Sequence, residues 1–526
     1  MEKSAPAPTQ PHESSLAKNR VLKACIFATG LSGIVAEYVM STLASYLLGN
    51  AILQWTITIS LMLFSMGLGS RFSKSIQNAL LDSFIIIELI LSLICASSAI
   101  FIYFMSAYVQ SIDFFIYLVA LTVGFLIGIE VPLATRLNSY FEDLRYNISS
   151  VMENDYYGAL LGGLLFAFVA LPWLGLTYTP ILLGLINFLV ATVLFFQHRA
   201  VLKFSRGLTI AFSLTPLAFV ALFWAARPII LFADQKTYSD KIIFSQETPY
   251  QKILMTQWKD DFWLYLNDNT QFSSYDEEKY HEPLVHPALK LAHARKNILL
   301  LGGGDGMAAR EIFKYQDVAS ITIVDIDPAV TRLAKEHPLF IQQNQGVFND
   351  SRLHVRNEDA YTFLRESKEI FDVILIDLPD PKTVDLARLY TRQFYTLAYK
   401  HLSVGGTLVT QATSPFFAQK AFLSIMLTMR STGYPAVPFH NHIPTMGEWA
   451  WVLGYKHKET TDEALKKRII TLDFTDIKTK FINADAMLGM TLFGKGMFDN
   501  SGEIRINDEF NLTLYEYYKN GSWDLF

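Results

Sequence analysis

The feature that most constrains this chain is the scarcity of charge in its first half. Residues 24 to about 230 carry few charged side chains, and the whole 526-residue chain is 51% hydrophobic and only 18% charged. A membrane-spanning helix needs about 20 mostly apolar residues. Seven segments qualify: 24–47, 52–70, 83–105, 114–135, 156–173, 178–197 and 207–226. We therefore expect a multi-span membrane domain of about seven helices over residues 21–232, lying in the lipid bilayer of the cell membrane after a disordered tail at 1–20.

The loops between these segments alternate in charge. Lys and Arg follow the second, fourth and sixth segments and precede the first, whereas the other loops carry neither. The positive-inside rule then places the amino terminus in the cytoplasm, and seven spans place residues 235–526 outside it. That placement conflicts with the glycine-rich motif of the second half, described below, because the cofactor that it is expected to bind is held in the cytosol. Either one segment does not cross, the last being broken by Pro216, or the second half faces outward; we expect the cytoplasm.

Three acids lie inside the apolar segments, namely Glu37, Glu88 and Glu130. An ionisable group at membrane depth is costly and is a functional hypothesis by default. Glu37 stands among small residues, so close helix packing around a protonated or hydrogen-bonded glutamate is the structural alternative. Both interpretations, packing and a path for cations or polyamines, stay open.

The second half has an ordinary soluble composition. Short β-rich runs at 241–244, 251–257 and 262–266 predict a β-hairpin domain over 233–290. Strands near 297–301, 321–325, 353–356, 373–377 and 407–411 alternate with helical stretches, which predicts a parallel α/β Rossmann-like fold of the methyltransferase type over 291–460. We expect residues 461–526 to form an extension that packs on this domain.

A glycine-rich turn at 302–306 follows the first of these strands and opens a helix. Nineteen residues after its last glycine, the next strand ends in Asp325. A strand, a tight turn, a helix and a second strand with an acid at its end are typical of an adenosine-binding half-fold. Gly302 and Gly304 let the backbone approach the ligand, and Asp325 accepts hydrogen bonds from the ribose.

Asp305 places a negative charge inside this turn. S-Adenosylmethionine carries a carboxylate on its methionine tail, which Asp305 would repel by about 4 kcal/mol at 4 Å and an effective dielectric near 20. The decarboxylated cofactor ends in an ammonium, which Asp305 would attract. The charge therefore favours aminopropyl transfer over methyl transfer.

Polar side chains stand at or just after the carboxyl ends of the predicted strands, where open α/β sheets bind ligands. They are Asp325, Asp359, Asp377 and Gln411. Asp377 and Asp380 lie three residues apart after one buried strand. One carboxylate can orient an attacking amine and accept its proton while the other holds the far ammonium of a diamine. The alternative for Asp380 is a turn cap before Pro381.

Several classes of site are disfavoured. The net charge of −5, with no basic stripe, gives no footprint for nucleic acid. The chain has only two cysteines, Cys25 and Cys95, both in apolar segments. Two cysteines are too few for a disulfide framework or for a cysteine-ligated metal site. The pair His281 and His286, with Glu282 between them, could suggest a metal site. No further ligand stands at a recognised spacing, so we expect no metal.

These residues together resemble the polyamine aminopropyltransferases, the spermidine synthase family, and in particular its membrane-fused bacterial branch. The likeness covers about 240–455 and rests on motifs in order along the chain. They are Tyr250-Gln251, Gln271, Asp276-Glu277, Tyr280-His281-Glu282, the turn at 302–306, Val324 to Asp327, Asp359-Ala360, Asp377 to Pro381, Leu389-Tyr390, Phe394-Tyr395, Gly405-Gly406 and Gln411. Gly128 to Leu133, Phe439-His440, Gly447 to Trp449 and the tail from Thr479 to Trp523 are similar to the membrane-fused branch.

The resemblance implies roles for these residues. Asp377 would deprotonate or orient the attacking amine with support from Tyr280. Gln251, His281 and Asp305 would hold the tail of decarboxylated S-adenosylmethionine, the expected co-substrate, and Asp325 its ribose. Asp359 would bind the amino group of the adenine, and Ala360 would lie beside it in the cofactor-binding set. The substrate-binding set, which would line the polyamine channel, is Gln271, Asp380, Gln411 and Glu448.

The sequence departs from the family at three places. Asp325 replaces a glutamate, Ala360 replaces a glycine, and Lys382-Thr383-Val384 follows Asp380-Pro381 where Gly-Pro or similar is usual. A lysine beside a polycation channel puts the acceptor amine in question. The leading hypothesis is a membrane-anchored, homo-oligomeric enzyme that converts putrescine to spermidine. The alternatives are an S-adenosylmethionine-dependent methyltransferase, and a polyamine or cation transporter with a nucleoside-sensing domain.

Overall fold

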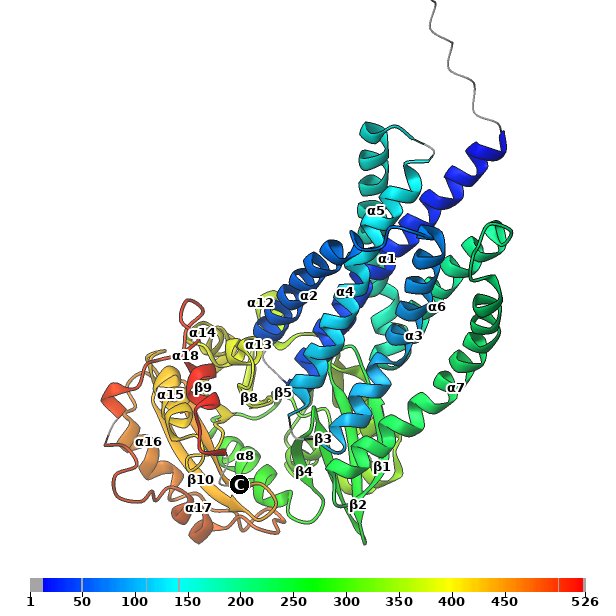
Figure 1. Cartoon of the computed structure of the whole chain (residues 1–526). Helices are drawn as coiled ribbons and strands as arrows, with labels where there is room; N and C mark the ends of the chain where they lie inside the picture. Colours follow the sequence, from blue (N-terminus) through cyan, green and yellow to red (C-terminus); the bar gives the residue numbers. More distant parts are fainter. Residues whose placement is uncertain (1–12, 49–50, 110, 141, 500, 524–526) are drawn as a thin grey trace, which may run out of the picture. The chain divides into compact units, whose positions relative to one another are not determined.

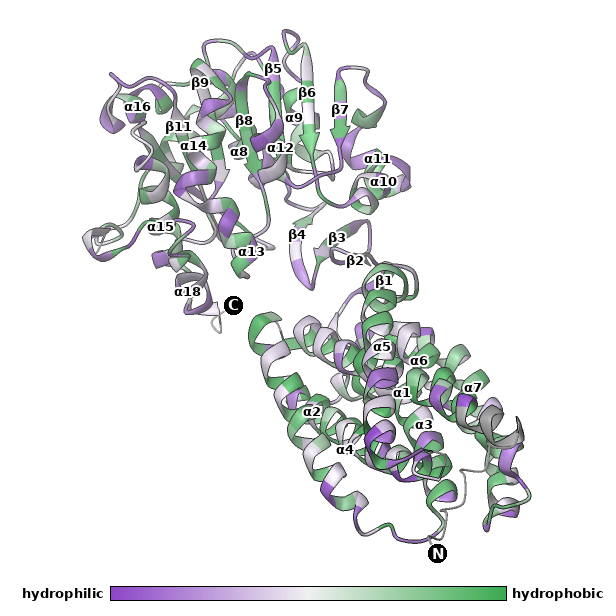
Figure 2. Cartoon of the chain, turned by 90° about the horizontal axis from the view of Figure 1, so that it is seen from above, coloured by the Kyte–Doolittle hydropathy of each residue, from purple (hydrophilic) through white to green (hydrophobic). Residues whose placement is uncertain are grey.

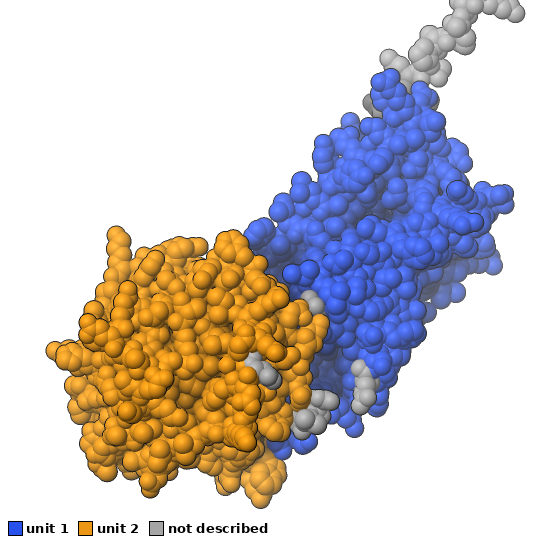
Figure 3. Space-filling model, turned by 90° about the vertical axis from the view of Figure 1, so that its left-hand side faces the viewer, with its two compact units in different colours: residues 1–240 blue, residues 241–526 orange. Residues whose placement is uncertain are grey.

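The computed structural model describes residues 13–48, 51–109, 111–140, 142–499 and 501–523. The chain divides into two compact units, Met1–Asp240 and Lys241–Phe526 (Figure 3). Residues 1–12 of the predicted tail lie outside the described residues. The remainder of that tail is helical, because the first helix begins at Glu13 and contains good helix formers such as Leu16 and Ala17.

The first unit consists of helices (Figure 1). They are α1 (Glu13–Leu48), α2 (Ala51–Ser73), α3 (Leu80–Ser106), α4 (Ile112–Asn138), α5 (Leu144–Leu165), α6 (Leu171–His198) and α7 (Ser205–Thr237). The π-helical turn η1 (Phe166–Ala170) joins α5 to α6 without a loop. By length and composition, six helices of the described residues are suited to cross a membrane, and one of them is the 55-residue run Leu144–His198.

The fifth and sixth predicted segments, 156–173 and 178–197, both lie within that run, and a kink at Gly175 separates them. Only Gly175 interrupts the long run, with φ 61° and ψ −171°, a conformation that glycine adopts without steric cost. The expectation that Pro216 breaks the last segment is wrong, since α7 continues through Pro216 and Pro228. Helix α7 also ends at Thr237, beyond the predicted domain boundary at 232.

Small residues let the helices of the first unit approach closely. A Cβ at Gly128 of α4 would lie 2.2 Å from the Met66 carbonyl oxygen of α2, and one at Gly158 of α5 would lie 2.0 Å from the Phe27 carbonyl oxygen of α1. This type of contact is common between membrane helices. Hydrophobic residues predominate along these helices (Figure 2), and many of them are exposed, such as Trp224 of α7, which is 75% exposed. Such a surface matches an apolar solvent better than water.

The three acids of the apolar segments are all buried, and Glu88 is 0% exposed. Among the described residues neither carboxyl oxygen of Glu88 has a hydrogen-bond partner.

The second unit begins with a four-stranded antiparallel sheet in the order β1-β2-β3-β4. Its strands are β1 (Lys241–Glu247), β2 (Lys252–Trp258), β3 (Asp261–Leu266) and β4 (Asn269–Ser273). The sequence predicted the first three. The fourth is short and polar, but the two-residue turn before it has positive φ at Asn267 and Asp268 (48° and 60°), as tight hairpins require.

The larger sheet has seven strands in the order β10-β11-β9-β8-β5-β6-β7. They are β5 (Asn297–Gly302), β6 (Ser320–Val324), β7 (Leu353–Arg356), β8 (Phe371–Asp377), β9 (Leu402–Gln411), β10 (Ala436–Ile443) and β11 (Gly447–Tyr455). The first five are parallel and match the five predicted strands, which confirms the Rossmann-like fold. The antiparallel β10–β11 hairpin was not predicted, because β10 carries Pro438 and two histidines on an edge strand, where proline is tolerated.

Helices pack around this sheet. They are α8 (Glu278–Leu291), α9 (Met307–Ile312), α10 (Pro328–Glu336), α11 (Pro338–Asn344), α12 (Ala360–Glu366), α13 (Val384–Ala387), α14 (Arg392–Lys400), α15 (Gln419–Arg430), α16 (Asp462–Ile469), α17 (Ala484–Met490) and α18 (Thr513–Lys519). Short 3₁₀ turns lie at Val347–Asn349, Arg388–Tyr390 and Ser501–Glu503.

The carboxyl-terminal segment shares the core of the second unit. Leu465 and Ile469 of α16 are buried with Leu289 of α8. The Glu282 carboxylate of α8 accepts hydrogen bonds from the backbone N–H groups of residues 480, 481 and 482, at 2.7, 2.8 and 2.8 Å. The predicted divisions at 290 and 460 fall inside this one unit and stay predictions.

Candidate active site

The site forms at the topological switch point of the large sheet, where open α/β sheets bind ligands. From β5 the chain runs outward through β6 and β7, then returns to β8 and β9 on the other side. Gly302 at the end of β5 pairs with Asp377 at the end of β8. The glycine turn and the acidic loop, predicted separately, therefore lie side by side.

The glycine turn closes onto the end of β6. Gly302, Gly303 and Gly306 have φ of 82°, 65° and 85°. The Gly304 N–H donates to Asp325 Oδ2 at 3.1 Å, and a Cβ at Gly304 would lie 2.4 Å from the same oxygen. Only glycine fits there, so the turn and Asp325 form one structural element.

Asp325 is partly buried, and burial raises its pKa to about 6, although the backbone N–H groups of Asp327 and Gly304 oppose the shift. The predicted residue Gln251 reaches this segment through Asp327. Gln251 Nε2 and Thr248 Oγ1 donate to Asp327 Oδ2 at 3.1 and 2.8 Å. Asp327 thus ties the small sheet to the segment that follows β6.

Asp305 accepts a hydrogen bond from the Met307 N–H at 2.8 Å, which fixes its carboxylate at the start of α9. Burial raises the pKa of Asp305, and the charge of His281 lowers it. His281 Nδ1 donates to Glu277 Oε2 at 2.8 Å. Burial lowers the pKa of His281, but Glu277 outweighs it and raises the value to about 9. The hydrogen bond to Glu277 and the charge of Glu277 therefore favour the protonated form of His281.

Glu277 is a residue whose role was missed. Arg310 Nη2 donates to Glu277 Oε2 at 3.0 Å, and Gln343 Nε2 donates to Glu277 Oε1 at 3.0 Å. The spacing of Glu277 and His281, four residues apart on one helix face, was the available signal. Glu277 keeps His281 charged and fixed in position.

Asp377 and Tyr280 are brought together as predicted. Tyr280 Oη donates to Asp377 Oδ1 at 2.6 Å. The Tyr280 ring packs against Trp451 and His281, with centroid distances of 5.4 and 5.0 Å. Burial raises the pKa of Asp377 to about 6, and Asp305 adds to this shift, while His281 and the Tyr280 hydroxyl oppose it.

Asp380 and Gln411 also meet, and the structure adds a tyrosine to them. Gln411 Nε2 donates to Asp380 Oδ1 at 3.1 Å, and Tyr518 Oη of α18 donates to Asp380 Oδ2 at 2.8 Å. Burial raises the pKa of Asp380, and Lys382 is the first of the groups that lower it. No local pattern marked Tyr518, because it follows Asp380 by 138 residues.

The remaining predicted site residues make local contacts. Asp359 caps α12 by accepting from the Thr362 N–H at 2.8 Å, and Arg388 lies 3.7 Å from its carboxylate. Ala360 is buried as the first residue of that helix. Gln271 donates to the Asn269 carbonyl at 3.1 Å on the same strand. Glu448 of β11 binds His440 of β10. Their predicted roles toward adenine and amine stay predictions.

A possible metal-ligand cluster exists among the described residues. Glu282, His286 and Glu311 are buried with ligand atoms within 4.8 Å of one another. Glu311 of α9 is the third group that the sequence spacing did not reveal. However, Glu282 already accepts three backbone N–H groups, and Glu311 accepts from His286 at 2.9 Å and Arg310 at 2.9 Å. Burial opposes ionisation of Glu311, but these partners and Lys314 lower its pKa to about 2. The cluster is therefore an internal ion network.

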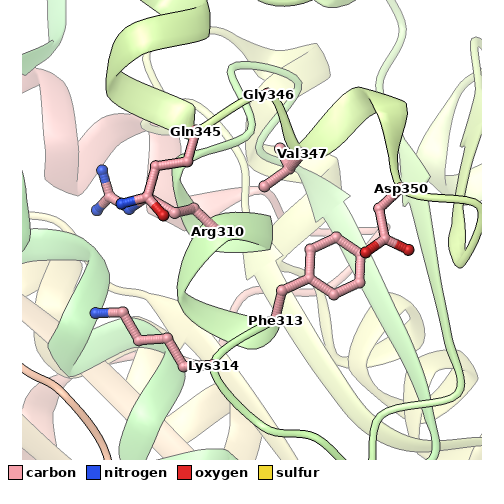
Figure 4. A pocket seen from close by; sticks show the side chains of 7 residues that line it. All are labelled: Arg310, Phe313, Lys314, Gln345, Gly346, Val347 and Asp350. Carbon is pink, nitrogen blue, oxygen red and sulfur yellow. The ribbon is translucent and has the colours of Figure 1, made fainter.

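A surface cavity of about 380 Å³ lies between the end of α9 and the segment 345–350 (Figure 4). Its lining residues are Arg310, Phe313, Lys314, Gln345, Gly346, Val347 and Asp350. None is a predicted site residue. The Arg310 guanidinium already donates hydrogen bonds to Glu277, Glu311 and the Gln343 carbonyl. We therefore place the chemistry at the strand ends.

The pH dependence of activity is expected to follow Asp377. Its pKa of about 6 means that the carboxylate is lost as the pH falls through 6, so kcat/KM should fall there, and Asp325 should steepen the decline. In Tyr280→Phe, a hydrogen bond that stabilises the ionised form is gone, so this acid limb should move to higher pH by about one unit. Tyr315→Phe, which alters a buried tyrosine bonded to His286, is the control. An unmoved limb in Tyr280→Phe would contradict the assignment.

Fold and site together define an enzyme of the Rossmann-like, methyltransferase-type class, with an acidic rim suited to cationic ligands. A family model described as the spermine/spermidine synthase domain matches residues 277–466. Polyamine aminopropyltransferase 2 of Aquifex aeolicus is 39% identical over 500 residues, covering 95% of this chain and 98% of the relative. Polyamine aminopropyltransferase of Oceanobacillus iheyensis is 38% identical, covering 88% and 90%.

The chain belongs to the polyamine aminopropyltransferase family and is an aminopropyltransferase. The resemblance read from the sequence is thereby confirmed. The alignments cover most of both chains and therefore extend over the first half of this chain as well as the second. A solved spermidine synthase in complex with the transition state analogue AdoDATO is 23% identical, covers 50% of this chain and 89% of its own, and has a TM-score of 0.45.

Proposed function

We propose that this enzyme transfers the aminopropyl group of decarboxylated S-adenosylmethionine to putrescine and yields spermidine. The observation that carries the proposal is the Asp377 carboxylate, held by Tyr280 at 2.6 Å beside the glycine turn. A base at the end of β8 would lie next to the reactive end of a nucleoside bound at the glycine turn.

The donor would be held along the turn. Asp325 would accept hydrogen bonds from the ribose, and Asp305 would attract the ammonium at the end of the cofactor's tail. The donor carries a sulfonium and an ammonium, both positive. Burial raises the pKa of Asp305, Asp325 and Asp377. A cationic ligand would stabilise the ionised form of each of these acids.

The acceptor would be held from the other side. Asp377 would orient the attacking amine and accept its proton, and Asp380 would bind the far ammonium of the diamine. The amine nitrogen forms a bond to the aminopropyl carbon as the carbon–sulfur bond breaks. Methylthioadenosine leaves with the electron pair. Because the sulfonium is a good leaving group, positioning should supply much of the rate.

The deciding experiment is incubation of the purified full chain, in detergent, with labelled decarboxylated cofactor and a panel of amines. Spermidine and methylthioadenosine should form from putrescine in equal amounts. A parallel incubation with S-adenosylmethionine tests the methyltransferase alternative. Methylated product from the second incubation, with no aminopropylated amine from the first, would refute the proposal.

We further propose that the helical unit anchors the enzyme in the cell membrane with the catalytic unit in the cytosol, where the cofactor is made. The apolar exterior and the six long apolar helices support the anchor. The chain should stay in the membrane fraction after an alkaline carbonate wash. A tag at residue 526 should resist impermeant reagents in intact cells. Homo-oligomerisation stays a prediction that light scattering in detergent would test.

A further inference from the structure

Lys382 joins three segments that are far apart in the sequence. It follows Asp380-Pro381 in the loop after β8. Its Nζ donates to Asn269 Oδ1 at the start of β4 and lies 5.9 Å from the ring centroid of Tyr518 in α18. The side chain is half-buried. Its ammonium is therefore held in place by the small sheet and by the carboxyl-terminal helix.

This ammonium contributes positive charge in the neighbourhood of Asp380. The hydrogen-bond donors to the Asp380 carboxylate are the neutral side chains of Gln411, Tyr518 and Thr413, at 3.1, 2.8 and 3.5 Å. Lys382 attracts the same carboxylate electrostatically. Tyr518 contacts both groups, through its hydroxyl to Asp380 and through its ring to Lys382. Through Tyr518, the Lys382 side chain is thus linked to the acid proposed to hold the far end of the acceptor.

We propose that Lys382 limits the length of the acceptor. This inference rests on the proposed function and names the substrate class of the same site, short diamines. A diamine places one nitrogen at Asp377 and its second at Asp380. A triamine has a further ammonium beyond the second, which would have to approach Lys382 and Tyr518. Two like charges repel more strongly in a partly buried site than in water, because the effective dielectric is lower there. The longer amine is therefore rejected.

The test compares acceptors across variants of the full chain in detergent. Lys382→Met removes the charge at similar length, and Lys382→Arg keeps it. The control is Lys368→Met, an exposed lysine outside the site. For each variant, kcat/KM is measured with putrescine and with spermidine as acceptors. The ratio of spermidine to putrescine should rise roughly tenfold to a hundredfold in Lys382→Met and stay near the parent value in Lys382→Arg and Lys368→Met.

The outcomes separate the two proposals. If the parent transfers to no amine, the proposed function fails. An active parent that prefers spermidine, or an unchanged ratio in Lys382→Met, overturns the length limit while leaving the function standing. Should Lys382→Met unfold, as judged by its thermal transition, Lys382→Gln decides, because an amide can still donate to Asn269. A folded, neutral variant that has lost activity toward both amines also overturns the inference, since Lys382 would then serve turnover.

Discussion

Replacing Asp377 by Asn is expected to lower kcat by roughly three orders of magnitude while the affinity for the decarboxylated cofactor changes by less than about threefold. A positioned general base contributes about 10²- to 10⁴-fold. The amide keeps the shape of the carboxylate and can still accept from Tyr280 Oη, but it cannot take a proton from the amine. Single-turnover kinetics with putrescine, together with calorimetric titration of the cofactor, measures both quantities.

Asp385→Asn is the matched control for this change, because Asp385 is exposed in the first turn of α13, a short distance along the same loop. It should keep the parent rate. Near-normal turnover in Asp377→Asn would remove Asp377 from the chemistry. A rate loss caused entirely by weaker cofactor binding would make it a binding residue instead.

Replacing Asp305 by Asn is expected to reduce the preference for the decarboxylated cofactor over S-adenosylmethionine by about 10- to 100-fold. The repulsion between two carboxylates, on the order of 4 kcal/mol at 4 Å and a dielectric near 20, is an upper bound on this effect. Asn can still accept from the Met307 N–H, so the turn keeps its geometry. Calorimetric titration of both cofactors gives the ratio.

Methylthioadenosine provides the control ligand for this variant, because it shares the adenosine and sulfur but has no charged tail. Its affinity should be the same for the parent and for Asp305→Asn. A preference that survives the substitution would mean that the charge of Asp305 does not select the donor. An equal loss of affinity for all three nucleosides would indicate a distorted turn.

The parts of the fold that were predicted correctly depend on short stretches of sequence. Strands β5 and β8 each contain four consecutive apolar residues, β6 is rich in β-branched residues, and the glycine turn stands at a fixed distance from Asp325. The parts that were missed lack such patterns. Strand β10 mixes Pro438 with polar residues, and β4 is almost wholly polar, so neither shows apolar alternation. Residues 13–20 lacked the apolar character of a span, yet they continue α1.

The site divides in the same way. Asp305, Asp325 and Asp377 could be named from motifs, because each stands at the end of a predicted strand or in the turn after it. Glu277 and Tyr518 could not be given roles, because they act through partners elsewhere in the chain. Tyr518 donates to an acid 138 residues earlier, and Glu277 binds Arg310 on another helix. The sequence alone likewise placed Lys382 near the acceptor but not its ammonium against Asn269 and Tyr518.

The sequence by itself determined the apolar helices, the parallel strands and the acids at the strand ends, since hydrophobic periodicity and turn chemistry act over a few neighbouring residues. Only the tertiary structure decided which donor each carboxylate meets and how far burial shifts its pKa. Tyr280 reaches Asp377 across 97 residues because α8 packs beside β8. Contacts of that kind depend on how whole elements pack, which no local pattern encodes.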